Sequence, residues 1–212
     1  MKTLIAVLTC VRNSNLVRLS RETWVPRATA SGYDVQFFDG ARCHCTDDYL
    51  SVVPKIMYMF KWAAFNGYGR MLKLADDTYV RVDRLRDFGV DYGGHIWPAC
   101  DFGIQRDGIV IPDAPAGTYP YNFVSGGAVW LSRKSILIAS NAAPNGDWTD
   151  DRWTGDVLAR AGIAYTALPE IVLRHNANQG YCACTPANDM PYVCYMDAGE
   201  RMPELHKEML GA

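Results

Sequence analysis

The sequence predicts a single α/β domain with a mostly parallel central sheet flanked by helices. Strand-like apolar runs alternate with segments of helical periodicity along most of the chain, which is typical of that class. The first run, TLIAVLTC at residues 3–10, is continuously apolar, as in a strand buried on both faces. With 212 residues and 49 % hydrophobic composition, the chain can bury one sizeable core.

In the first half, the expected elements are a strand at 3–10, a helix at 15–30, a strand at 33–39 and a helix at 47–66. The second helix has Asp47 as its predicted N-cap, and Gly67 is expected to close it. Pro54 either kinks this helix or marks its true start.

The second half continues the alternation. Strands are expected at 70–77, 78–82, 122–132 and 164–175, an aromatic stretch at 95–104, helices at 133–143, 150–161 and 202–212, and a loop-like segment at 176–199. The second of these helices has Thr149 as its predicted cap and Gly162 beyond its end.

Composition argues against several classes of partner. A net charge of −2 and a pI near 6.1 give no electrostatic footprint for nucleic acid or an anionic membrane. The first apolar run is too short for a transmembrane segment and lacks the layout of a cleaved signal. Seven cysteines, with close pairs at Cys43/Cys45 and Cys182/Cys184, do not form a secreted disulfide pattern. We therefore expect a reducing, cytoplasmic setting.

The stretch KLADDTYVRVD ends a predicted strand on two adjacent carboxylates, Asp76 and Asp77. In a parallel sheet, ligands lie at the carboxyl ends of the strands. Two neighbouring carboxylates raise each other's pKa unless a cation compensates, and carboxylate oxygens suit Mg²⁺ or Mn²⁺. The alternative is an ordinary Asp-Asp-Thr turn or helix cap.

Five motifs occur in one order along the chain: RETW at 21–24, Lys55 with Trp62, KLADDTYVRVDRL, YPYNFVSGGAVWLS and TDDRWTG. The series spans about residues 4–175 and resembles the GT-A glycosyltransferases of the Fringe and β-1,3-galactosyltransferase type. The chain length and the lack of a predicted anchor are also similar to the glycosyltransferase domains of large-DNA-virus capsid enzymes.

The resemblance implies a Mn²⁺ or Mg²⁺ site. Where the family has three consecutive acids, this chain has Ala75, Asp76 and Asp77, so the first acid is missing. The last acid commonly holds the metal, which gives that role to Asp77, with Asp76 orienting donor hydroxyls or joining the metal site. His175, in VLRHN, is implied as the second protein ligand.

The resemblance also implies a UDP-sugar donor. Thr9 and Arg12, at the end of the first strand, are expected to face the nucleotide, because loops after the first strand cradle it in such sheets. Lys55, in the helix expected at 47–66, is implied as a further donor-binding residue. Arg12 either contacts the diphosphate or is merely solvated. Gly126 and Gly127 either let a sugar approach closely or form a bulge.

Asp150 and Asp151 are the candidate catalytic acids. The resemblance implies that Asp151 is the general base, which would invert the anomeric configuration. A retaining mechanism stays open because the metal motif is altered. The alternative is that both acids only interact with the helix dipole.

The implied function is transfer of a hexose or 6-deoxyhexose from a UDP-sugar to a hydroxyl of an oligosaccharide or glycoprotein, in the host cytoplasm if the protein is viral. Residues 1–100 would form the nucleotide and metal half, 101–175 the acceptor and catalytic half, and 176–212 a loop and short helix. The alternatives are a sugar nucleotidyltransferase, a carbohydrate-binding or nucleotide-sugar-binding module, and a zinc-organised interaction domain.

Overall fold

The computed structural model describes residues 1–97, 100–102, 105–106, 109–110, 117–119, 123–146, 149–173, 194–196 and 198–210. The helices are α1 (Ser14–Glu22), α2 (Val25–Ala30), α3 (Gly40–Cys43), α4 (Val52–Phe65), α5 (Arg133–Ser140), α6 (Asp150–Arg160) and α7 (Met202–Leu210). Across these residues, no helix is both long and apolar enough to cross a membrane.

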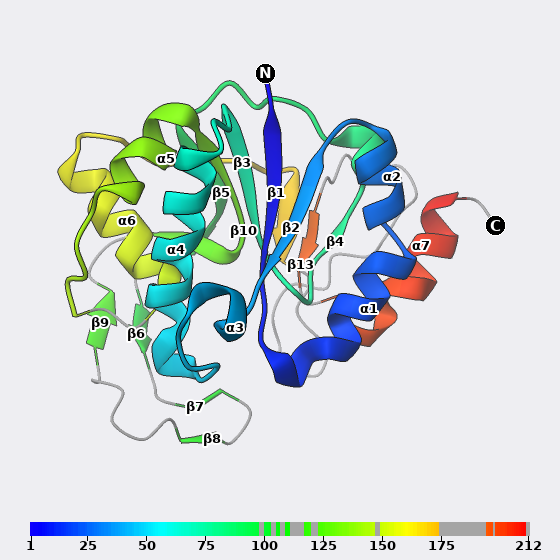
Figure 1. Ribbon diagram of the computed structural model, residues 1–212, viewed down its shortest axis with the longest axis horizontal. Helices are drawn as coiled ribbons and strands as arrows, with labels where there is room; N and C mark the ends of the chain where they lie inside the picture. Colours follow the sequence, from blue (N-terminus) through cyan, green and yellow to red (C-terminus); the bar gives the residue numbers. More distant parts are fainter. Residues whose placement is uncertain are drawn as a thin grey trace.

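The central sheet has six strands in the order β11-β5-β10-β3-β1-β2 (Figure 1). Their bounds are β1 (Thr3–Leu8), β2 (Asp34–Phe38), β3 (Arg70–Ala75), β5 (Tyr92–Trp97), β10 (Phe123–Ser132) and β11 (Thr166–Ala167). Only β10 runs against its neighbours, pairing antiparallel with both β3 and β5. The predicted fold class, an α/β domain with a mostly parallel sheet, is confirmed.

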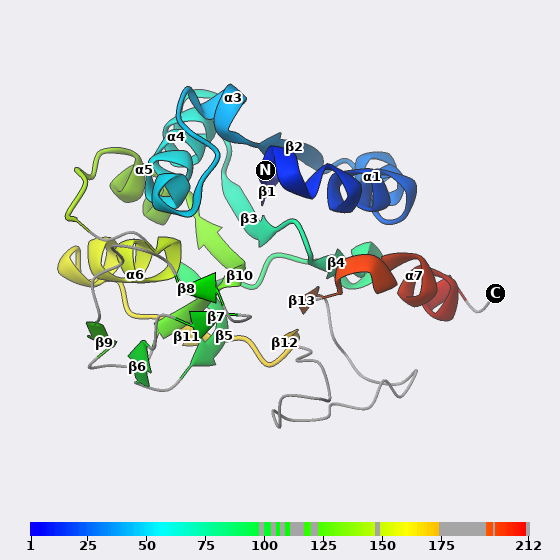
Figure 2. The same cartoon turned by 90° about the horizontal axis from the view of Figure 1, so that it is seen from below.

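A smaller sheet, β12-β13-β4, lies beside the central one, near α7 (Figure 2). It consists of β4 (Tyr79–Val80), β12 (Ile171–Leu173) and β13 (Cys194–Met196). Two short ladders, β6–β9 and β7–β8, are formed by β6 (Cys100–Phe102), β7 (Gln105–Arg106), β8 (Ile109–Val110) and β9 (Gly117–Tyr119).

Helices cover both faces of the central sheet, so β1 is buried on both sides as its continuous apolar run predicts. Leu4 and Ala6 belong to the core under α4, α5 and α6. Ile5 and Val7 belong to the core on the opposite face, which includes residues of α1, α2, the small sheet and α7. This alternation follows from the two-residue period of a strand.

The helix predicted at 15–30 is two helices, which corrects the sequence analysis. Thr23 leaves helical geometry with φ −111° and ψ −92°, and α2 begins two residues later. Pro26 explains the break because it has no N–H to donate to the carbonyl four residues earlier. Proline is tolerated where it lies, in the first turn of α2.

The helix predicted at 47–66 begins later, at Val52, with Ser51 at its N-cap position after a short 3₁₀ turn. Asp47 as the N-cap is therefore wrong. Pro54 lies in the first turn and marks the true start, the second of the two possibilities considered for it. Gly67, with φ +74°, follows the end of α4 as predicted.

The segment 164–175 was predicted as one strand, and this is wrong. It supplies β11 to the central sheet and β12 to the small sheet, with a turn closed by the Ile171 N–H donating to the Leu168 carbonyl. Pro169 interrupts the ladder because it cannot donate a hydrogen bond. The predicted loop at 176–199 also contains a strand, β13, which pairs with β12 and β4.

Candidate active site

The carboxyl ends of β1, β2 and β3 meet at one edge of the sheet, where their first following residues are Thr9, Asp39 and Asp76. The Thr9 N–H donates to the Phe38 carbonyl at 3.0 Å, and its hydroxyl donates to Asp76 Oδ2 at 2.6 Å. A pocket of about 400 Å³ opens beside the ends of β1 and β2. Its lining consists of Thr9, Cys10, Val11, Ser14, Val17, Arg18, Arg21, Glu22, Phe37 and Asp39.

Asp76 is a buried carboxylate, with 7 % of its surface exposed. Burial raises its pKa above the ordinary value of 3.8, while hydrogen bonds from Thr9 and Asn13 act in the opposite direction. The folded protein therefore holds this negative charge at a cost in free energy. Such a cost is typical of a functional residue, although structural networks also produce it.

We expect Asp76→Asn to raise the unfolding free energy of the ligand-free protein by about 0.5–2 kcal/mol at neutral pH. The asparagine can still accept from Thr9 but carries no buried charge. Because the pKa of Asp76 is raised in the folded state, its stability cost is absent below pH 3.8 and grows as pH rises above that value.

Denaturant unfolding in EDTA at several pH values measures the difference between Asp76→Asn and the wild type. If the two unfolding free energies are equal at neutral pH, or differ most in acid, the burial of the Asp76 charge does not destabilise the protein as assigned.

Asp77 follows Asp76 and is half-buried. Its carbonyl accepts from the Gly199 N–H at 3.1 Å, which ties the strand end to the C-terminal segment. His175, its predicted partner in holding a metal, lies outside the described residues. Within those residues, no group of three or more His, Cys, Asp or Glu side chains is arranged to hold a metal ion. The carboxylate oxygens of Asp76 and Asp77 are ligands of the kind that a hard divalent cation prefers.

Lys55, predicted to bind the donor, is a buried side chain with 4 % exposure. Its ammonium donates to the Thr9 carbonyl at 3.1 Å and to Asp47 Oδ1 at 2.8 Å. Asp47 also accepts from the backbone N–H groups of Val11 and Gly40. Lys55 and Asp47 thus connect the segments that follow β1 and β2 with helix α4.

The ionisation of Asp47 is determined by these contacts. Burial alone would raise its pKa, but the hydrogen bonds from Lys55 and from the two backbone N–H groups outweigh burial and lower it. Asp47 is therefore held ionised where it contacts Lys55 and the turn after β1. Arg12, by contrast, is exposed on the turn after β1 and is not part of the pocket lining.

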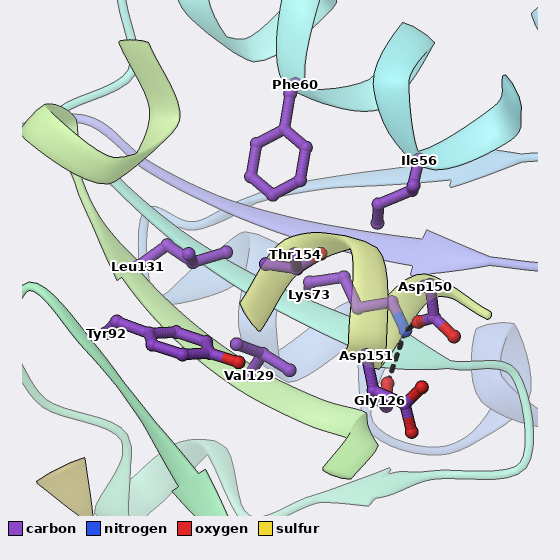
Figure 3. A pocket seen from close by; sticks show the side chains of 10 residues that line it. All are labelled: Ile56, Phe60, Lys73, Tyr92, Gly126, Val129, Leu131, Asp150, Asp151 and Thr154. Carbon is purple, nitrogen blue, oxygen red and sulfur yellow. Dashed lines mark hydrogen bonds and ion pairs between the residues drawn. The ribbon is translucent and has the colours of Figure 1, made fainter. Parts of the chain in front are cut away.

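A second, smaller cavity of about 10 Å³ lies against the N-terminus of α6 (Figure 3). It has room for about one water molecule. Its polar lining consists of Lys73, Tyr92, Gly126, Asp150, Asp151 and Thr154, and its apolar lining of Ile56, Phe60, Val129 and Leu131. The structure thus brings both predicted catalytic acids and Gly126 to one place.

Lys73 was not singled out from the sequence. It lies on β3 with its side chain 4 % exposed, and its ammonium donates to Asp150 Oδ2 and to the Gly126 carbonyl. A signal was present, because a lysine inside the otherwise apolar run MLKLA must find a partner if the strand is buried.

Tyr92, on β5, adds a polar atom to the small cavity. Its hydroxyl is among three buried side-chain atoms of the described residues that have no hydrogen-bond partner. Burial raises its pKa, and the negative charges of Asp151 and Asp150 raise it further. Both carboxylates therefore act electrostatically on this hydroxyl.

The two glycines of β10 have different surroundings. A Cβ added at Gly126 would lie 2.7 Å from Asp150 Oδ2, so this glycine permits the close approach of α6. The Gly127 carbonyl accepts from Thr78 Oγ1 at 3.1 Å. The pairing of β10 with β5 shifts register between Val124 and Val129, as the bulge interpretation expects. Close approach of a sugar to these glycines stays a prediction.

The zinc-organised domain stays an alternative. Cys10, Cys43, Cys45 and Cys194 form no disulfide, and burial raises the pKa of Cys43 to about 12. Cys182 and Cys184 lie outside the described residues.

The arrangement of the sheet and helices is that of a glycosyltransferase fold. This chain is similar to a solved glycosyltransferase that is involved in glycosylating the major capsid of PBCV-1, with a TM-score of 0.55, 15 % sequence identity and coverage of 100 % of each chain. At that identity the likeness establishes the fold, and the kinship to the Fringe type stays a prediction.

A second solved structure is described as a glucose-1-phosphate thymidylyltransferase from Bacillus anthracis. It has 11 % identity over 78 % of this chain and 87 % of that chain, with a TM-score of 0.42, too low to support an argument. No protein-family model matches the chain, and no curated protein matches it in sequence.

Proposed function

We propose that the protein is a metal-dependent glycosyltransferase that moves a hexose or 6-deoxyhexose from a UDP-sugar to a hydroxyl of an oligosaccharide or glycoprotein. The proposal rests on what is found where the strands of this glycosyltransferase fold end. That region has an open pocket, a buried acid at the end of β3 and a second acid pair at the start of α6.

The open pocket is the proposed nucleotide site. Its volume of about 400 Å³ lies within the range of small-molecule sites, and it combines an aromatic ring, Phe37, with polar groups at the ends of β1 and β2. The hydroxyl oxygen of Thr9 and the free carboxylate oxygen of Asp39 would accept hydrogen bonds from a base or ribose. Arg21, whose guanidinium lies over the Phe37 ring, brings positive charge that suits a diphosphate, while Arg18 is paired with Glu22 at 2.7 Å.

Asp77 and His175 are proposed to hold Mn²⁺ or Mg²⁺, and Asp76 to orient donor hydroxyls. A cation bound there would stabilise the negative charge that develops on the departing diphosphate. The raised pKa of Asp76 supports a role beside a cation, because a neighbouring positive charge would relieve the cost of its burial. Lys55 acts on the donor site through Thr9 and Asp47 rather than by direct contact.

Asp151 is the proposed general base. Asp150 is engaged with Lys73, which leaves the proton-accepting role to its neighbour at the same cavity. Asp151 would remove the proton of the acceptor hydroxyl as that oxygen attacks the anomeric carbon, and the configuration there would invert.

A donor panel tests the proposal. UDP-glucose, UDP-galactose and UDP-rhamnose are each incubated with Mn²⁺ and a mixture of oligosaccharide acceptors, and NMR identifies the sugar and linkage of any product. We expect UDP release and transfer with one of these donors. Formation of a UDP-sugar from UTP and a sugar 1-phosphate would favour the nucleotidyltransferase alternative, and sugar binding without turnover would favour a binding module.

The acceptor is proposed by fold likeness alone. The solved structure that this chain resembles is of a glycosyltransferase involved in glycosylating a viral major capsid. A glycan of a viral capsid protein is therefore the first glycoprotein acceptor to add to the panel.

A further inference from the structure

Lys73 is a buried cation on a strand whose other inward side chains are apolar. It lies on the same face of β3 as Met71, towards α4, α5 and α6, and only 4 % of its side chain is exposed. A buried ammonium is costly unless it is paired and hydrogen-bonded. The partners of Lys73 therefore indicate which elements its charge fixes in place.

Those partners come from two different elements. One is the carboxylate of Asp150, in the first turn of α6, and the other is the backbone carbonyl of Gly126, on β10 (Figure 3). The absence of a side chain at Gly126 lets this contact form, since a Cβ there would collide with the Asp150 carboxylate. One ammonium thus fixes the start of α6 against the strand beside β3.

Asp151 is the next residue of α6 and lines the same small cavity. Within the described residues, the titratable groups that share this lining with Asp151 are Lys73 from β3, Asp150 from α6 and Tyr92 from β5, while α4 contributes the apolar Ile56 and Phe60. Adjacent carboxylates raise each other's pKa, and a nearby ammonium opposes this effect.

We propose that Lys73 is a positioning residue of the active site, which acts through Asp150 to fix the first turn of α6 and supplies the positive charge that keeps Asp151 ionised as a base. The inference rests on the proposed function only where it calls Asp151 a base. The expected effect of the Lys73 charge on the ionisation of Asp151 does not depend on that function. It also divides the acid pair: Asp150 holds the helix in place, and Asp151 accepts the proton.

Opposite shifts in the titration of Asp151 follow from this arrangement. Removing the cation in Lys73→Met should move the midpoint of the Asp151 carboxyl upward by on the order of one pH unit. Removing the neighbouring anion in Asp150→Asn should move it downward by a similar amount. A role in folding alone, or an effect of the helix dipole alone, produces no such pair of opposite shifts.

The measurement is a ¹³C NMR titration of protein labelled at aspartate carboxyls, with the Asp151 signal identified by its loss in Asp151→Asn. It needs no substrate. Failure to find transfer with any donor would therefore count against the proposed function and leave the titration result intact. Lys134→Met, which removes an exposed lysine of α5, is the control and should leave the midpoint unchanged.

Lys73→Met alone leaves a partly buried carboxylate without its cation and can fail to fold. The double variant Lys73→Met/Asp150→Leu replaces the pair with apolar side chains, which proteins often tolerate. Because it removes one charge of each sign, its Asp151 midpoint should fall between those of the two single changes. The comparison that isolates the Lys73 charge is the double variant against Asp150→Asn, in which the Asp151 midpoint should be higher in the double variant. An Asp151 midpoint that is the same in these two variants would overturn the proposal.

If transfer activity is found, the acid limb of the pH–rate profile should move in the same directions as the midpoint of Asp151. A fall in rate at all pH values without movement of that limb would assign Lys73 a structural role only.

Discussion

Asp151→Asn is expected to lower the rate of sugar transfer by about two to four orders of magnitude, the usual contribution of a general base. Asparagine keeps the shape of the side chain but cannot accept the proton of the acceptor hydroxyl. Because Asp151 lies at the small cavity against α6 and not in the lining of the open pocket, Mn²⁺-dependent affinity for UDP should be unchanged.

Single-turnover kinetics and UDP titration on the purified variant separate these two effects, with circular dichroism as the folding control. Asp156→Asn, further along α6, is the matched control and should transfer at the normal rate. If Asp151→Asn transfers nearly as fast as the wild type, Asp151 is not the base, and a retaining mechanism becomes the better account.

UDP is expected to stabilise the protein only when Mn²⁺ or a similar cation is present. Asp76 and Asp77, at the end of β3, repel a diphosphate unless a cation lies between these carboxylates and the phosphates. At about 100 times its dissociation constant, UDP should then add roughly 2.7 kcal/mol to the unfolding free energy. Thermal unfolding with UDP in Mn²⁺ and in EDTA measures the difference.

The same assay tests the ligands. Asp77→Ala should abolish the Mn²⁺-dependent part of the UDP effect and leave the fold intact, because Asp77 is half-buried at the start of a turn. His175→Ala should do the same if the residue is the second ligand. Asp87→Ala removes an exposed acid paired with Arg70 and should bind UDP normally. Equal UDP effects in EDTA and Mn²⁺ would exclude the metal site.

Several roles could not be predicted from the sequence because they depend on contacts between distant segments. Asp47 looked like a helix cap eight residues before Lys55, but its carboxylate joins the ends of β1 and β2 to α4. Lys73 and Asp150 are 77 residues apart in the chain and become partners because α6 packs on β10, the strand beside β3. Asp39 follows β2 as Asp76 follows β3, a pattern that could have indicated its place in the pocket lining.

The sequence by itself determined the order of most strands and helices, the α/β class and the position of the two acid pairs. Apolar periodicity and the placing of glycine and proline are local properties, and an acid at the end of a buried parallel strand must lie at the edge of the sheet. Only the tertiary structure decided that β10 runs antiparallel, that β12 and β13 belong to a separate small sheet, and that Asp150 pairs with Lys73. Those outcomes depend on which strand pairs with which and on which residue pairs with each buried charge. Such long-range partners have no fixed spacing in the sequence, so a local pattern does not reveal them.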